Sequence, residues 1–318
     1  MSDALKNRYD FVLFFDVKDG NPNGDPDAGN LPRMDPETGQ GLVTDVCLKR
    51  KVRNFVQMTR GEEPSYGIFI REKGILNDMI MGAYDALKID LNADPKDKND
   101  GKRDAKKKGK GSEIESARQW MCQTYYDIRT FGAVMSTGVN AGQVRGPVQF
   151  TFARSVDPIS VLEHSITRMA VASGAKKQRK NQSEIFQVAT SDEVKKQKDK
   201  DMGHKATIPY GIYMAYGFIS PYLAAQTGFN QTDLDLFWEA LVHMFEHDRS
   251  AARGLMSTCK IVVFKHDSAL GNASSRDLFD RVRVVKKSGE SPAMDRSDYE
   301  ITIVRENLPD GIEIIEMA

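Results

Sequence analysis

The hydrophobic pattern of the chain begins with an almost unbroken apolar run from Tyr9 to Val17, in which Asp10 and Asp16 are the polar positions. A β-prone run without alternation is typical of a strand that is buried on both faces. We therefore expect the chain to begin with a central strand of a sheet.

The next segment, from Asp19 to Pro36, contains four Pro and three Gly among several Asn and Asp residues. Neither a helix nor a strand accommodates that composition. It predicts a long, rigid loop, and ordered loops of this length in compact domains are usually functional.

A helix is predicted to begin after Thr44, because Thr is a favourable N-cap residue and Asp45 follows in the first turn. Basic residues recur along this helix at Lys49, Arg50 and Arg53. They make it a candidate surface for an anionic partner.

The rest of the chain contains segments with the hydrophobic spacing of helices and segments with the alternation of strands. In one such strand, we expect Val148, Phe150 and Phe152 on the same face. Collected in order, the elements fit an α+β fold with a ferredoxin-like or RRM-like βαββαβ core and two large insertions. The predicted helices are Ile75–Leu87, Glu113–Ile128 and Asp233–His247, and the further strands are Phe131–Met135, Val148–Val156, Ile208–Ser220, Lys260–His266, Arg281–Lys286 and Tyr299–Arg305.

Composition adds limits to this picture. The 318 residues carry 45 basic and 45 acidic side chains, so an anionic partner must be met by local patches. Basic clusters occur at 95–111, 176–180 and 195–198, in segments with little apolar content.

No apolar run approaches the roughly 20 residues of a membrane span, and the start lacks a signal segment, so we expect a cytoplasmic protein without membrane contact. Three separated Cys residues predict neither a disulfide framework nor a zinc knuckle.

Two motifs resemble metal sites, and both fail on inspection. The loop that starts at Asp19 has oxygen ligands and a glycine spaced as in a calcium-binding EF-hand, but Asn30 replaces the required bidentate Glu and no helix precedes it.

The sequence motif H-x-x-E-H at His243 to His247 matches a class of zinc peptidases. A helical projection places both His away from the apolar face that contains Leu234 and Phe237. No nucleophile motif is present either, so we predict no catalytic residue, no cofactor and no metal.

A different pattern does recur, in which a basic residue lies next to a glycine or a short amide. It occurs after the first loop, along the first helix, in the turn before Pro147 and at the end of the second insertion. Such groups hold the phosphates and sugars of nucleic acids without reading bases, and we expect them to converge into one groove. The alternative is a set of unrelated solvated faces. The aromatic RRM signature is absent, so base stacking on the sheet is not predicted.

Several long stretches of the chain, taken together, resemble one known family. They are RYDFVLFFDVKDGNPNGDPDAGNLPR, GLVTDVCLKRKVRNF, FGAVMSTGVNAGQVRGPVQFTFARSVDP, MGHKATIPYGIYMAYGFISPYLAAQTGF and FWEALVHMFEHDRSAARG. In order and extent they are similar to the backbone subunit of the type I-C CRISPR surveillance complex, Cascade, in the seventh Cas family. The resemblance covers nearly the whole chain.

The resemblance implies a modified RRM palm, a helical finger insertion and a β-hairpin thumb. It also implies a non-catalytic subunit of antiviral defence, whose copies assemble head to tail along one CRISPR RNA beside other Cascade subunits. The guide then pairs with target DNA. The expected divisions are 1–59, 129–156 and 208–318 for the palm, 60–128 for the fingers and 157–207 for the thumb region.

The resemblance also suggests that Met202 acts as an apolar wedge and that His204 and Lys205 contact an adjacent phosphate. A second hypothesis is a metal-dependent endoribonuclease that uses Asp25 or Asp27, and a third is a generic single-strand binder that forms no filament. The predicted RNA-binding set is Asn21, Asn23, Arg33, Lys49, Arg50, Arg53, Gln143, Arg145, Arg168, Met202, His204 and Lys205.

Overall fold

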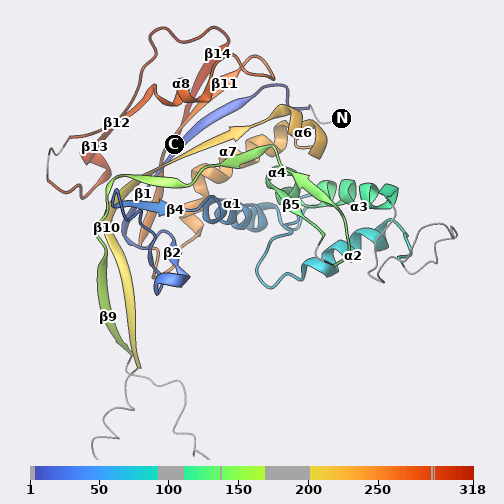
Figure 1. The fold of residues 1–318 in the computed structure, drawn as a ribbon, viewed down its shortest axis with the longest axis horizontal. Helices are drawn as coiled ribbons and strands as arrows, with labels where there is room; N and C mark the ends of the chain where they lie inside the picture. The colour runs from blue at the N-terminus through green and yellow to red at the C-terminus, as the bar shows by residue number, and fades with distance from the viewer. Residues whose placement is uncertain (1–3, 92–110, 137, 169–200, 288, 290) are drawn as a thin grey trace, which may run out of the picture.

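The core of the protein is a mixed α+β assembly built on one large antiparallel sheet (Figure 1). The computed structural model describes residues 4–91, 111–136, 138–168, 201–287, 289 and 291–318. Within these residues, β1 (Tyr9–Gly20) lies in the interior of an eight-stranded sheet, as its apolar run predicts. The strand order is β14 (Ile312–Met317), β11 (Leu255–His266), β1, β10 (Asp201–Ile219), β8 (Ala153–Pro158) and β4 (Gln40–Val43), and β7 (Val148–Phe150) and β9 (Leu162–Arg168) also pair with β10.

Protein layers bury β1 on both sides, which explains why its sequence does not alternate. Phe11 and Phe15 belong to a core shared with α1 (Asp45–Arg60) and α7 (Gln231–His247). Val12 and Phe14 belong to a second core. That core includes residues of α8 (Ser275–Phe279), β12 (Val282–Lys286) and β13 (Tyr299–Ile303). Both faces of β1 are thus buried from Tyr9 to Phe15.

α1 begins at its predicted cap, whereas α7 begins at Gln231, before the predicted start at Asp233. The Thr44 hydroxyl accepts a hydrogen bond from the Cys47 N–H at the start of α1. At the start of α7, the Asn230 side chain and the Asp233 side chain form a reciprocal capping box. His243 and His247 are both exposed on α7, as the helical projection predicts, although the His243 ring stacks on the core residue Phe55 with a centroid distance of 6.4 Å.

A third hydrophobic cluster lies between helices on one side of the sheet (Figure 1). It joins α2 (Leu76–Ala86), α3 (Gly111–Thr124) and α4 (Tyr126–Phe131) to the strand pair β5 (Gly132–Val134) and β6 (Gln143–Arg145).

The single helix predicted for 113–128 is wrong, because the chain is extended at Tyr125. There the Gly67 N–H donates to the Thr124 carbonyl and the Tyr126 N–H donates to the Gly67 carbonyl. These two bonds divide the segment into α3 and α4.

The strand predicted for 148–156 is also interrupted. Thr151 Oγ1 accepts from the Tyr216 N–H and donates to the Phe152 carbonyl, a local side-chain bond that competes with the sheet ladder. The alternation shifts by one residue, so Ala153 is buried and Phe152 is 53% exposed. The prediction that Phe152 shares a strand face with Val148 and Phe150 is therefore wrong. The pattern also missed β4, β14, β2 (Gly24–Asp25), β3 (Leu31–Pro32), α6 (Pro221–Thr227) and α8.

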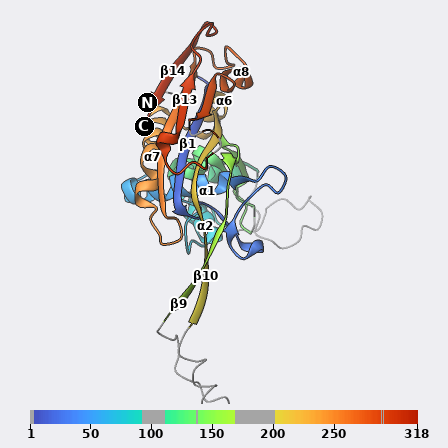
Figure 2. The same ribbon diagram turned by 90° about the vertical axis from the view of Figure 1, so that its left-hand side faces the viewer.

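The β9–β10 hairpin projects from the end of the sheet in both views (Figures 1 and 2). Its pairing runs from Thr207 opposite Leu162 to Asp201 opposite Arg168. The basic clusters at 176–180 and 195–198 lie outside the described residues, as does 95–111 apart from Gly111. None of the helices in the described part of the chain is long and apolar enough to span a bilayer.

Candidate nucleic-acid interface

Two adjoining cavities lie where the loop after β1 meets α1, the segment after α7 and the base of the hairpin. Their volumes are about 410 and 340 Å³, and they share Asn21, Asn30 and Ala252. We call them together the loop groove. The polar and charged side chains that line it are Asn21, Asn23, Asn30, Thr44, Arg50, Lys51, Asn54, Glu163, His204, Lys205, Asp248, Ser250 and Arg253.

The loop is held in place by its own amide side chains. Asn23 Oδ1 accepts hydrogen bonds from both the backbone N–H and the hydroxyl of Thr44, each at 3.0 Å. The Asn21 N–H donates to the Ala252 carbonyl at 2.7 Å. The loop is thereby fixed to the start of α1 and to the segment that follows α7.

The same loop contains two buried polar atoms without a partner among the described residues. Asn21 is 7% exposed, and its Oδ1 accepts no hydrogen bond. The Nε of Arg33 is likewise unpaired, although the guanidinium reaches Asp25 at 3.4 Å. The Asp25 carboxylate also accepts from the Asp27 N–H. In the described part of the chain, no group of three or more His, Cys, Asp or Glu residues is placed to hold a metal ion.

The loop groove carries positive charge. Arg50 is exposed on α1 and has no ion pair or hydrogen bond to any described residue. Lys51 and Arg253 both bind the carboxylate of Asp248, which is 9% exposed. Because two cations share one carboxylate, this cluster keeps a net positive charge next to Arg50.

Sequence reasoning missed Lys51, Asp248 and Arg253. The signal for Arg253 was present, since it precedes Gly254 in the same pairing of a basic residue with a glycine that marks the other positions. Gly254 has a left-handed φ of 61°. A Cβ atom on Gly20 would lie 1.9 Å from the Arg253 carbonyl oxygen, so the two segments touch along their backbones.

Lys49 and Arg53 lie on α1 but do not line the loop groove. Lys49 Nζ binds Asp45 at 3.0 Å and Gln149 Oε1 at 3.2 Å. The Arg53 Nε binds Asp127 at 2.8 Å, and the Arg53 side chain is 10% exposed. Both cations are therefore engaged within the protein.

The hairpin contributes residues from both of its faces. Successive residues of a strand point to opposite sides, so His204 and Lys205 do not point the same way. Both line the loop groove, His204 exposed and Lys205 half-buried. Met202 and Arg168 lie further along the hairpin, opposite Thr167 and Asp201, and their side chains are outside the described set.

Gln143 and Arg145 are exposed on β6, apart from the loop groove. The β5–β6 pair lies across α1 from β2 (Figure 1). The structure thus brings together Asn21, Asn23, Arg50, His204 and Lys205, with Arg33 directly after β3. It leaves Lys49, Arg53, Gln143 and Arg145 elsewhere.

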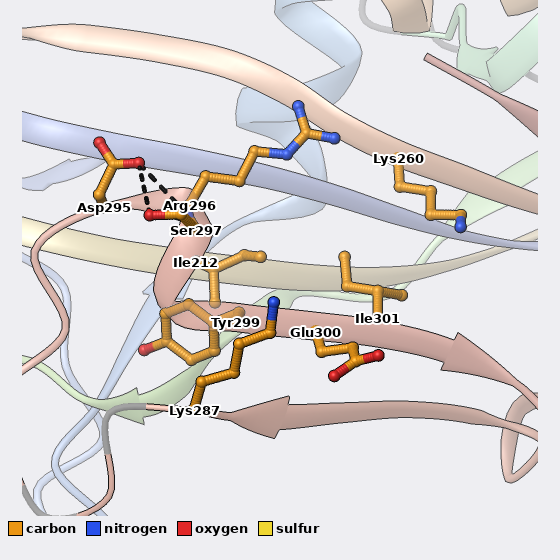
Figure 3. A pocket seen from close by; sticks show the side chains of 9 residues that line it. All are labelled: Ile212, Lys260, Lys287, Asp295, Arg296, Ser297, Tyr299, Glu300 and Ile301. Carbon is orange, nitrogen blue, oxygen red and sulfur yellow. Dashed lines mark hydrogen bonds between the residues drawn. The ribbon is translucent and has the colours of Figure 1, made fainter.

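A cavity of about 550 Å³ lies on the opposite face of the sheet (Figure 3). Lys260 and Arg296 approach it above Ile212. Several of its charges are paired, since Lys260 binds Glu316 at 2.6 Å and Asp295 binds Lys18 at 3.5 Å. The loop groove is the candidate site for an anionic ligand, because it joins Arg50 to other residues of the set predicted from the sequence.

A thiol also lines the loop groove, but it is not an activated nucleophile. Burial raises the pKa of Cys47, and its Sγ donates weakly to the Pro22 carbonyl. A protonated thiol attacks poorly. The described residues of the loop groove offer cations, amides and backbone groups that can bind an anionic ligand.

Comparison with known proteins agrees on one family. The family described as CRISPR-associated protein Cas7 matches residues 7–304. The CRISPR-associated protein Cas7 of Haloferax volcanii is 27% identical over an alignment of 248 residues, and the match covers 74% of this chain and 64% of that protein. This chain thus spans less than two-thirds of that relative.

Two similar solved chains come from CRISPR RNA-guided surveillance complexes, one of them in a pre-nicking state. The pre-nicking chain has a TM-score of 0.46 at 16% identity, covering 81% of this chain and 78% of its own length. The second has a TM-score of 0.42 at 16% identity, covering 81% of this chain and 68% of its own length.

Proposed function

Because this chain belongs to the CRISPR-associated Cas7 family, we propose that it is a non-catalytic backbone subunit that binds CRISPR RNA in a type I-C Cascade complex. The observation that carries the proposal is the loop groove, where amides and cations from distant segments meet. Arg50 and Arg253 supply charge for phosphates, and loop amides and N–H groups suit phosphate and sugar oxygens.

Such a groove leaves the bases free. The protein holds the guide through its backbone, and base pairing with target DNA supplies the sequence specificity. The closed faces of β1 support this mode, because they leave no surface there on which bases stack. Both considerations favour a guide whose base edges face outward.

The arrangement of elements supports an RRM-like palm. A ferredoxin-like unit has the element order strand, helix, two strands, helix, strand. The chain offers this order in β1, α1, β8, β10, α7 and β11, and the four strands are adjacent in the sheet in the order β11, β1, β10, β8. In the proposal, the α2–α4 cluster forms the fingers and the β9–β10 hairpin forms the thumb, with Met202 as its wedge. Copies assemble head to tail in the cytoplasm beside other Cascade subunits.

Salt-dependent binding of a labelled single-stranded RNA tests the function. Each phosphate contact to a single strand contributes about 0.7 to the log–log salt slope. We expect Arg50→Ala and Lys205→Ala each to lower the slope by about that amount. Arg276→Ala is a matched control, because this exposed cation lies on α8 and pairs with Asp280. Unchanged slopes in both groove variants would contradict the proposal.

The nuclease hypothesis is tested with the same material. Incubation of the RNA with the protein and Mg²⁺ is expected to leave the RNA intact. If the RNA were cleaved, and if EDTA stopped the cleavage and Asp25→Ala abolished it, the protein would be an endoribonuclease and not a binding subunit alone.

A further inference from the structure

We propose that the outer edge of β14 is a docking surface for a partner protein, which adds an extended segment to the sheet as a further antiparallel strand. The segment carries two apolar side chains and then one basic side chain, on alternate residues. This inference goes beyond the proposed function, because β14 lies at the edge of the sheet opposite β4 and does not line the loop groove.

The edge of β14 is open to pairing (Figure 2). β14 pairs with β11 on one side, and no described strand pairs with its other side. The outer N–H and C=O groups of an edge strand are a template for another strand, and strand addition is a common mode of peptide recognition. The neighbouring pairs along the sheet are antiparallel, so we assign the added strand the same direction.

An apolar cavity lies beside this edge, between α7 and the sheet. Its volume is about 400 Å³, and its apolar lining includes Trp238 of α7 with Ile315 and Met317 of β14. Ile315 and Met317 are only half-buried. Residues two apart on a strand share one face, so two side chains of an added strand would lie beside Ile315 and Met317. Burial against this surface favours apolar side chains at both positions.

A row of directly opposite residues crosses the same face and ends at Glu313. Tyr9 lies opposite Lys265, and Lys265 lies opposite Glu313. Lys265 Nζ binds the Glu313 carboxylate at 3.0 Å, so these two charges compensate each other. The next position in the row belongs to the added strand.

Asp235 gives this end of the cavity an excess of negative charge. It is exposed, it lines the cavity, and its carboxylate accepts a hydrogen bond from the neutral amide of Gln231 at 2.8 Å. Burial raises the pKa of Tyr9, and the charges of Asp235 and Glu313 raise it further, so both carboxylates lie near one hydroxyl. Opposite charges that face each other across strands are stabilising. The side chain opposite Glu313 should therefore be Lys or Arg.

The strand direction sets the order of these side chains. In an antiparallel partner, the residue opposite Met317 comes first, the one opposite Ile315 follows two residues later, and the one opposite Glu313 two residues after that. The partner segment thus reads apolar-x-apolar-x-basic.

The probe is a fluorescent synthetic peptide, Ser-Val-Thr-Val-Val-Lys-Thr-Ser, whose binding to the full chain is followed by anisotropy. We expect saturable binding, and binding about fivefold weaker when Glu replaces Lys in the peptide. Two more peptides each carry one N-methyl group, on adjacent central residues. Adjacent residues direct their N–H groups to opposite sides of a strand, so one of these peptides loses about tenfold in affinity and the other binds like the parent.

Asp235→Lys reverses the excess charge at an exposed position. It is expected to weaken the lysine peptide about fivefold and to strengthen the glutamate peptide by a similar factor. Asp277→Lys is the matched control, because Asp277 is an exposed acid on α8, which packs on the other face of the sheet. It leaves both affinities unchanged.

Three results would overturn the inference. Absence of saturation up to about 1 mM peptide excludes the docking surface. Equal affinities of the two N-methyl peptides exclude strand addition, and an unchanged preference between the lysine and glutamate peptides in Asp235→Lys excludes the assigned charge. Self-association of the protein that Asp235→Lys abolishes and Asp277→Lys does not would make a second copy the occupant, which also contradicts the proposal.

Discussion

Replacing Arg53 with methionine is expected to weaken the fold and to leave the RNA affinity of the folded protein unchanged. The Arg53 guanidinium binds the Asp127 carboxylate at 2.8 Å, and Asp127 is 1% exposed. The same guanidinium lies 5.3 Å from the centre of the Phe131 ring. Methionine retains contact with the ring but leaves the carboxylate without its cation.

The magnitude follows from what remains around Asp127. Removing one partner of a buried ion pair usually costs 3–5 kcal/mol, because a charge is left uncompensated. Asp127 keeps hydrogen bonds from the N–H groups of Phe69 and Ile70 at 2.8 and 3.0 Å. We therefore expect a loss of about 3 kcal/mol in the free energy of unfolding, at the lower end of that range.

Urea unfolding and RNA binding are measured on the same samples, with Arg50→Ala as the matched control. Arg50 lies on the same helix, but it is exposed and unpaired among the described residues. With a urea slope of about 3 kcal/mol per M, the Arg53→Met midpoint falls by about 1 M. Arg50→Ala changes the free energy of unfolding by less than about 0.5 kcal/mol and weakens RNA binding.

The two variants thus have opposite effects on two measurements. If Arg53→Met unfolded at the wild-type urea concentration and bound RNA more weakly, Arg53 would be a phosphate contact, and the reasoning from its buried ion pair would be refuted.

Three further outcomes are expected. Gly20→Ala places a Cβ against the Arg253 carbonyl, so it lowers the free energy of unfolding by about 2 kcal/mol and also lowers RNA affinity. The control Gly82→Ala, which has open space around its Cβ, lowers neither quantity. In urea unfolding, Asp233→Asn costs about 3 kcal/mol or more, because it breaks the buried pair with Arg129, while exposed Asp235→Asn costs little. Burial raises the pKa of Cys122 from 9.0 to about 11, so its thiolate fraction at pH 8 is about a hundredfold lower, and thiol reagents label it only after unfolding.

The fold was predictable where the signal was local and strong. The apolar run of β1 identified a central strand, and the predicted cap Thr44 lies at the start of α1. Predictions failed where a distant segment intervened. Tyr125 leaves the helix because Gly67, far away in sequence, pairs with it.

The candidate site was predictable in composition but not in geometry. The pairing of basic residues with glycines and amides found Asn21, Arg50 and Lys205, which do meet in the loop groove. It could not separate Arg50 from Arg53, because both are basic residues on one helix. Their difference depends on Asp127, which arrives from another part of the chain.

β10 is a single strand of 19 residues that begins in the protruding hairpin and ends in the middle of the sheet. Because sides alternate along a strand, inserting or deleting one residue near Thr207 would rotate everything beyond it by half a turn. His204 and Lys205 would then exchange sides. Only changes of two residues at a time therefore keep His204 and Lys205 on their present sides of the strand.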